Sequence, residues 1–149
     1  MAFSHDGNLL ATGNASGTIR LWQVMPGTPP TPVGAPLTGP DGRIFAMVFD
    51  PRDGSLAVGT GAEQIWLWDI AEPTRPRAHV KLDGSGKSYT ELAFSEDGSM
   101  LAGAGGDVRL WEVDPARVAA RICRESGDVI TETEWHKHVA DVPYRSPCP

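Results

Sequence analysis

Few side chains in this sequence could carry chemistry, and four of them lie near its end. Cys123, Cys148, His136 and His138 are the residues that could ligate a metal ion. The two histidines are two positions apart on an expected helix, where they would point to different faces. No two cysteines are close together in the chain, as a zinc site of the usual spacing would require. We therefore predict no metal site, and none of these residues as a ligand.

The same two cysteines could instead form a disulfide. A bond between Cys123 and Cys148 would tie the end of the chain to the preceding helix. The reducing conditions of the cytoplasm disfavour such a bond. We expect reduced, partly buried thiols.

Two further segments contain residue types that are typical of catalytic or cofactor sites. Ser4, His5 and Asp6 are the types of a nucleophilic triad, but three neighbours in one turn cannot form the line of nucleophile, base and orienting carboxylate. The glycine-rich run 103–106 looks like a phosphate-binding loop, but we expect a strand after it where such loops lead into a helix. We interpret both segments as turns. The prediction is that the chain has no catalytic residue, no cofactor-binding residue and no enzymatic activity.

Three repeated segments indicate the architecture that must position any site. Each starts with an apolar residue and a phenylalanine, passes through an Asp-Gly pair and ends on a tryptophan. The recurring residues are Phe3, Phe49 and Phe94 at the start and Trp22, Trp68 and Trp111 at the end. The phenylalanines are 46 and 45 residues apart, and the tryptophans 46 and 43. Periods of this length are typical of propeller blades, each of which is a four-stranded sheet.

The local sequence of each repeat agrees with such a sheet. Asp6-Gly7, Asp53-Gly54 and Asp97-Gly98 are hairpin signals, because glycine tolerates a positive φ. A blade is apolar on both faces and buries them only by stacking on its neighbours. We therefore expect the three closing tryptophans to lie in the core between blades. Trp66 replaces an arginine of the other repeats, and the sequence leaves open whether it packs between blades or forms an exposed contact.

These residues resemble the WD40 family, whose repeats typically read Phe-Ser-Pro-Asp-Gly, then Leu-Ala-Ser-Gly, then Val-Arg-Leu-Trp-Asp. The resemblance covers roughly residues 2 to 113 and implies outer strands at 30–37 and 77–82. Ser16, Ala62 and Gly105 stand where the family has its turn aspartate. The resemblance therefore implies that the buried His–Asp–hydroxyl–Trp network of the family is absent, and that apolar packing carries more of the stability.

The predicted fold is all-β, a partial WD40-type propeller of about three four-stranded blades in an incomplete ring, with a short C-terminal helical cap. We place the blades at residues 1–38, 39–82 and 83–113, and the cap and tail at 114–149. Asp114-Pro115 is a helix start and Gly127 a stop. Residues 131–134 form a capping box that begins a second helix, which ends at Pro143.

The start of the chain coincides with the end of a blade's first strand, and a ring needs at least about four blades to close. We expect Met1 to be an internal methionine of a longer protein, with assembly of open arcs as the alternative. The ending is similar to the C-termini of large actinobacterial WD40 proteins, in which helix-turn-helix, STAND-type NTPase or kinase modules often precede the propeller.

Net charge and the absence of special segments limit the function further. The formal net charge is −6 with no basic cluster, which disfavours nucleic acid and membrane surfaces as partners. The chain shows no secretory signal, so we expect a cytoplasmic protein. The proline-rich stretch 26–36 is expected to be a stiff loop, although Pro29-Pro30-Thr31-Pro32 could dock an aromatic groove.

The resulting functional prediction is a non-enzymatic scaffold for protein–protein interaction, at the C-terminal end of a larger regulatory or signalling protein. One alternative is a ligand-sensing propeller subunit of a STAND-type NTPase or kinase. Another is a truncated gene fragment without independent function. The protein partner is not identified by the sequence, and self-association through open blade faces is a further expectation.

Overall fold

The computed structural model of the protein describes residues 1–83, 88–126, 131, 133 and 137. The chain divides into two compact units, Met1–Trp111 and Glu112–Pro149. The first unit holds the repeats, and each unit is described by itself.

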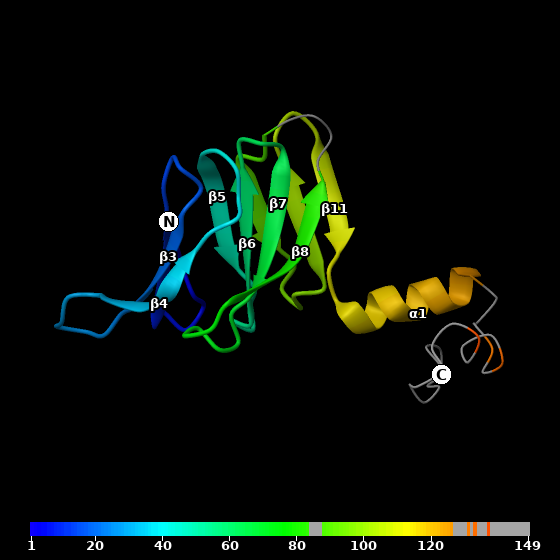
Figure 1. The fold of residues 1–149 in the computed structure, drawn as a ribbon, viewed down its shortest axis with the longest axis horizontal. Helices are drawn as coiled ribbons and strands as arrows, with labels where there is room; N and C mark the ends of the chain where they lie inside the picture. The colour runs from blue at the N-terminus through cyan, green and yellow to red at the C-terminus, as the bar shows by residue number, and fades with distance from the viewer. Residues whose placement is uncertain (84–87, 127–130, 132, 134–136, 138–149) are drawn as a thin grey trace. The chain divides into compact units, whose positions relative to one another are not determined.

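Each repeat folds as one antiparallel sheet, and the strands of every sheet follow the order of the chain (Figure 1). Blade 1 consists of β1 (Ala2–Phe3), β2 (Leu9–Gly13), β3 (Ile19–Gln23) and β4 (Thr31–Leu37). Blade 2 consists of β5 (Ile44–Phe49), β6 (Ser55–Thr60), β7 (Gln64–Asp69) and β8 (Arg77–Asp83). Blade 3 consists of β9 (Glu91–Phe94), β10 (Met100–Ala104) and β11 (Val108–Glu112).

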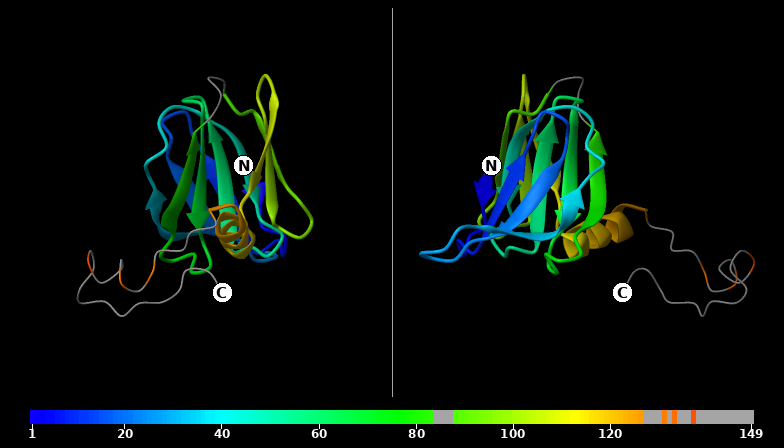
Figure 2. Two further views of the ribbon diagram at one scale, coloured as in Figure 1. Left: turned by 90° about the vertical axis from the view of Figure 1, so that its right-hand side faces the viewer. Right: turned by 60° about the vertical axis from the view of Figure 1, so that its left-hand side comes forward.

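The three stacked sheets form no closed ring and confirm the predicted all-β partial propeller (Figures 1 and 2). β4 and β8 confirm the predicted outer strands. Blade 3 differs from the expectation, because it has three strands instead of four among the described residues. The segment after β11 continues into a helix, so it supplies no fourth strand there.

Two of the three hairpin turns have the predicted glycine geometry. Gly7 and Gly98 adopt φ angles of 73° and 66°. In blade 2 the turn has the same length, but its Asp-Gly pair lies one position later, so Asp53 stands where the other turns have Gly7 and Gly98 and takes the left-handed conformation with φ of 55°. Aspartate tolerates this region better than most residues because its short polar side chain can hydrogen-bond locally. The pattern thus predicted the turn correctly but not the residue that bears its positive φ.

Strand alternation gives every blade two apolar faces, which we call the front and the back face. The front face carries the Phe–Leu–Trp row, and strand pairing aligns its members in blades 1 and 2: Phe3, Leu10 and Trp22; Phe49, Leu56 and Trp68. The back face carries the residues that alternate with them, which in blade 1 are Ala2, Ala11, Ile19 and Leu21.

The core between blades 1 and 2 joins one back face to one front face. Ala11 and Leu21 of blade 1 lie in one buried cluster with Phe49, Leu56 and Trp68 of blade 2. These five side chains are at most 6% exposed. Apolar burial at this seam is the main stabilisation that a single blade lacks, since each apolar side chain removed from water contributes about 1.5–3 kcal/mol.

The closing tryptophans confirm the expectation of an inter-blade position most clearly in blade 2. Trp68 is buried in the cluster between blades 1 and 2, and Trp66 stacks on it with ring centroids 6.3 Å apart. Trp66 is partly buried and packs against the same cluster. The structure therefore places Trp66 between blades, the first of the two alternatives.

The predicted loss of the family's tryptophan network needs one correction. In blade 1 the Trp22 Nε1–H donates to Thr12 Oγ1 at 2.8 Å, so a tryptophan–hydroxyl bond is present. Ser16, at the turn position, donates its backbone N–H to Asn14 Oδ1 instead of supplying an acidic group. The bond depends on a strand hydroxyl, which does not require the turn aspartate whose absence prompted the prediction.

The second unit begins with the predicted helix. α1 spans Pro115–Ser126, and the Asp114 carboxylate accepts hydrogen bonds from the backbone N–H groups of Ala116 and Arg117 at 2.9 and 3.1 Å. This confirms the predicted N-cap. The second expected helix and the tail fall almost entirely outside the described residues. No described helix has the length and apolar character that a membrane crossing needs.

Candidate binding groove

The first strands of the three blades form an open groove. β5 contacts β1 on one side and β9 on the other, so the starts of the three repeats lie next to one another. The hollow along them has a volume of about 290 Å³. Its lining repeats with the sequence and consists mainly of Phe3, Phe49 and Phe94 with the residues before them, Ala2, Val48 and Ala93.

The groove combines apolar walls with backbone edges. β1, β5 and β9 are each terminal in their sheet, so each leaves one edge of N–H and C=O groups unpaired by the described strands. Met47 and Leu92 add further apolar surface, while His5 and Pro51 lie at the end of the groove near the hairpin turns. Such a surface fits an extended segment that offers apolar side chains and backbone hydrogen bonds.

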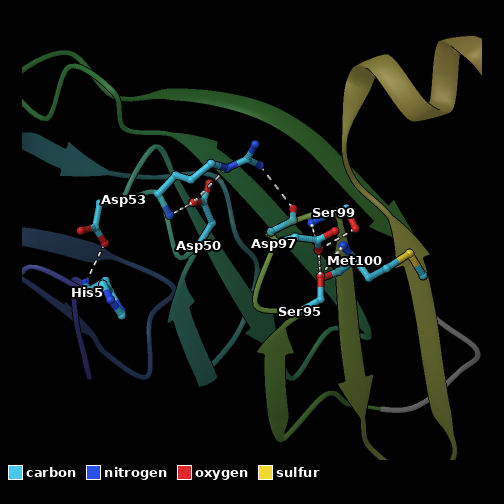
Figure 3. A network of polar contacts seen from close by, with 9 residues as sticks. His5, Asp50, Asp53, Ser95, Asp97, Ser99 and Met100 are labelled. Carbon is cyan, nitrogen blue, oxygen red and sulfur yellow. Dashed lines mark hydrogen bonds and ion pairs between the residues drawn. The ribbon is translucent and has the colours of Figure 1, made fainter.

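A line of polar contacts connects the hairpin turns at this end of the groove (Figure 3). The backbone N–H groups of His5 and Asp6 donate to the Asp53 carboxylate at 2.6 and 3.0 Å. On the other side, the Arg52 guanidinium donates to the Gly98 carbonyl at 3.4 Å. The turn of blade 2 is therefore held to the turns of both its neighbours.

Asp50 fixes the turn of blade 2 from inside. Its carboxylate accepts the backbone N–H of Arg52 at 2.5 Å and lies 3.9 Å from Nε of the same arginine. Asp50 is buried, whereas the Arg52 side chain is 60% exposed. Because the arginine side chain is largely exposed, this ion pair contributes little stability, and its effect is to orient the arginine toward blade 3.

Asp6 organises the turn of blade 1. The Ser4 hydroxyl donates to its carboxylate at 2.7 Å, and the backbone and side chain of Asn8 donate at 2.9 and 2.7 Å. These hydrogen bonds, that of Ser4 first, lower the pKa of Asp6 below its ordinary value of 3.8. Blade 3 repeats the arrangement, since the Ser95 hydroxyl donates to Asp97 at 2.7 Å.

This geometry determines where the triad-like residues lie. The Ser4 hydroxyl donates to Asp6 and not to His5, and Ser4 is buried. His5 joins the contact line through its backbone N–H. The three side chains do not form a nucleophile–base–acid line. The side chains of Ser4 and Asp6 hold the turn together.

Of the four candidate metal ligands from the sequence, the structure describes Cys123 alone. His136, His138 and Cys148 lie outside the described residues. Within the described part of the chain, no three His, Cys, Asp or Glu side chains are grouped to hold a metal ion. Cys123 is disulfide-bonded, contrary to the reduced thiol that we expected, because the prediction rested on compartment and not on chain geometry.

The glycine-rich run forms the connection between two strands. β10 ends at Ala104, Gly105 donates its backbone N–H to the Asp107 carbonyl at 3.1 Å, and β11 starts at Val108. A Cβ on Gly105 would lie 2.0 Å from the Ser88 carbonyl oxygen. Glycine is thus present to let two backbone segments approach.

Sequence reasoning missed the groove itself. The available signal was the pair of apolar residues that opens every repeat, because residues at one repeat position must line one surface of the stack. The contacts of Asp53 had a weaker signal, the Asp-Gly pair of the second repeat, which follows its phenylalanine one position later than in the other two repeats. No periodicity argument predicts which side chain such a shift will direct at a neighbour.

Comparison with known proteins identifies the repeat type. The family model described as "WD domain, G-beta repeat" matches residues 1–23 and 78–112. Anaphase-promoting complex subunit cdc20 of Dictyostelium discoideum is 31% identical over 117 residues, which are 76% of this chain and 22% of that protein. Target of rapamycin complex subunit LST8 of Rattus norvegicus is 28% identical over 107 residues, 70% of this chain and 31% of that protein.

Coronin-7 of Pongo abelii is 29% identical over 112 residues, 74% of this chain and 12% of that protein. The chain thus spans less than a third of the length of each of these three relatives.

Proposed function

Since the chain belongs to the WD40-repeat family, we propose that it is a non-enzymatic module that binds other proteins through the groove across β1, β5 and β9. The observation that carries the proposal is the groove itself, whose apolar lining repeats in register over three blades. Repeat proteins commonly bind partners on surfaces that several repeats build together.

The residues at the groove favour binding over chemistry. The polar side chains of the neighbouring turns are engaged in holding those turns, as the bonds of Ser4 with Asp6 and of Asp53 with two backbone N–H groups indicate. The groove itself offers a partner apolar surface, backbone edge and the His5 side chain. The names of two relatives, the cdc20 and LST8 proteins, describe subunits of complexes, which supports the same class of function for this chain.

We propose an extended protein segment with apolar side chains as the ligand. An extended segment can pair with the free edge of one of the first strands, β1, β5 or β9, while its alternate side chains enter the groove. His5 and Pro51 at the turn end would contact the residues that leave the groove.

A display experiment tests this function. The chain is immobilised, and twelve-residue random peptides displayed on phage are selected against it. We expect enriched peptides rich in apolar residues, whose affinity falls at least about tenfold in the variants His5→Glu and Pro51→Glu. The matched control is His79→Glu, an exposed histidine on β8 that does not line the groove. Equal binding to all variants, or no enrichment over an empty surface, would count against the proposal.

A further inference from the structure

A second hollow lies between the last strand of blade 1 and the connection from β7 to β8 in blade 2. Its volume is about 260 Å³, and its lining comes from residues 35–38 and 74–76 together with Trp68. Both walls belong to the compact unit Met1–Trp111. The hollow is separate from the groove, since the two linings share no residue.

The course of β4 creates this hollow. The register of β4 shifts against β3, so that Arg20 alone faces residues 34–36. An excess of residues of this kind bends a strand away from its neighbour. Gly34 has a φ of 65°, and a Cβ there would lie 2.9 Å from the Thr74 carbonyl oxygen. The bent strand thus approaches the β7–β8 connection closely at Gly34 and leaves space beside this contact (Figure 1).

The lining of the hollow combines an apolar floor with a polar edge. Leu37 and Trp68 form the floor and are 2% and 6% exposed, whereas Thr38, Thr74 and Arg75 are exposed. Proline side chains of both walls add apolar surface. An apolar lining with a few polar groups is typical of small-molecule sites, which hold drug-sized ligands in about 300–1,000 Å³. The hollow is below this range and therefore fits a smaller molecule.

The charge at the edge of the hollow is positive. Among the described residues that line it, Arg75 is the charged one. The Arg75 Nε lies 4.0 Å from Glu72 Oε1, and these two side chains are 77% and 63% exposed. Such an exposed pair contributes little stability. A carboxylate that accepts two parallel hydrogen bonds from a guanidinium is a stronger partner, so an anionic ligand can displace Glu72.

We propose that this hollow binds a small apolar carboxylate, with its ring or branched chain against Leu37 and Trp68 and its carboxylate on Arg75. The buried floor removes the apolar part of the ligand from water, which supplies affinity. The guanidinium selects for the negative charge. The hydroxyl groups of Thr38 and Thr74 can donate to the remaining lone pairs of the carboxylate.

Titration of the ¹⁵N-labelled full chain with 3-phenylpropionate, followed by nuclear magnetic resonance, tests the site. We expect saturable shifts of the Trp68 indole N–H and of the backbone amides of Leu37, Thr38 and Arg75, with a Kd on the order of 1 mM for a ligand of this size. The indole of Trp22, which does not line the hollow, should shift little. The neutral analogue 3-phenylpropionamide should bind at least about tenfold more weakly, because it lacks the charge.

Three exposed residues provide the variants. Arg75→Gln should weaken binding of the acid about tenfold, to the level of the amide. Glu72→Gln should strengthen binding about two- to threefold, because it removes the competing carboxylate of the exposed pair. The matched control Arg77→Gln removes the same charge from an exposed residue of β8 outside the lining, and the affinity should stay unchanged. The exposure of all three side chains means that folding should survive, as circular dichroism would check.

Three results would overturn the proposal. The first is equal affinity for the acid and the amide, and the second is unchanged affinity for the acid in Arg75→Gln. The third is the absence of any saturable shift at the hollow up to about 20 mM 3-phenylpropionate, well above the affinity expected for its size.

Discussion

At the scale of single residues, the three closing tryptophans differ in the hydrogen bond of the indole. Trp22 donates to Thr12, whereas Trp68 Nε1 is buried without a hydrogen-bond partner among the described residues. Val58 occupies the position in blade 2 that Thr12 has in blade 1, so the acceptor is missing. Trp111 in blade 3 instead makes an edge contact with Tyr89 at 5.6 Å over Gly103.

This comparison predicts the effect of exchanging the two strand residues. Val58→Thr should leave the free energy of unfolding unchanged or raise it by up to about 1 kcal/mol, because the new hydroxyl can accept from Trp68. Thr12→Val should lower the free energy of unfolding by about 1 kcal/mol, because Trp22 loses its acceptor. Urea denaturation measures both. A loss of more than about 1 kcal/mol in Val58→Thr, as expected for an unpartnered buried hydroxyl, would show that no bond forms.

The turn aspartate of blade 1 predicts a dependence of stability on pH. The pKa of Asp6 is lowered in the folded state, so its hydrogen bonds with Ser4 and Asn8 stabilise the fold fully above the ordinary pKa of 3.8 that the unfolded chain has. This stabilisation is lost as the pH falls through the lower folded value. The stability difference between wild type and Asp6→Asn should be constant from pH 7 to 5 and shrink below about pH 4.

Thermal melts across this range test the effect of Asp6. Ser4→Ala, which removes the first of the hydrogen bonds that lower this pKa, should reduce the low-pH dependence. The stability difference between wild type and Asp6→Asn is expected to shrink on acidification. A difference that grows would contradict this prediction.

At the scale of elements, turn glycines differ in whether a neighbouring segment of the chain packs against them. Gly17 lies in the β2–β3 turn with φ of 79°, and a Cβ there would come within 2.1 Å of the Pro40 carbonyl oxygen. Gly27 has nearly the same φ, 76°, with no atom within 4 Å of a Cβ. Both glycines have a left-handed backbone, but only Gly17 has a close backbone neighbour. Comparing them therefore separates the cost of the left-handed conformation from the cost of a close contact.

Alanine substitutions at these glycines should differ in cost. Gly27→Ala is expected to lower the free energy of unfolding by about 1–2 kcal/mol, the cost of a left-handed residue with a Cβ. Gly17→Ala should cost about 1–3 kcal/mol more, because the β4–β5 connection must move. Equal losses in urea denaturation would mean that the close approach at Gly17 is not maintained in solution.

The elements were the part of the structure that the sequence predicted best. The repeats predicted β4 and β8, the Asp-Gly pairs predicted the hairpins, and the Asp114 cap predicted α1. The predicted ends of these elements differ only slightly from the observed ones. These features are local, since turn and cap residues act within a few positions. The groove, the role of Asp53 and the position of Trp66 depend on contacts between blades, which local patterns do not contain.

At the scale of the whole molecule, one repeated interface explains both stability and binding. The back-to-front seam buries Leu21 against Trp68 between blades 1 and 2, and stacking of the same kind aligns the first strands that line the groove. A substitution in the seam should therefore lower the free energy of unfolding, and reduce binding only through the larger unfolded fraction. One in the groove should change binding alone.

Leu56 lies in the seam and is 0% exposed, so it is the residue at which we test the effect of a seam substitution. Leu56→Ala should lower the free energy of unfolding by about 2–5 kcal/mol through loss of packing and a new cavity. Peptide affinity should fall only in proportion to the unfolded fraction. His5→Glu should show the reverse, with unchanged urea denaturation and weakened peptide binding.

The measurement that tests the central claim most directly is nuclear magnetic resonance of the ¹⁵N-labelled chain during titration with a selected apolar peptide. The account predicts that the largest amide shifts map to β1, β5 and β9, with the N–H groups of Phe3, Met47 and Leu92 among them. Residues of β8 such as His79 should shift little. Shifts confined to β8 or to α1, with the first strands unchanged at saturation, would contradict it.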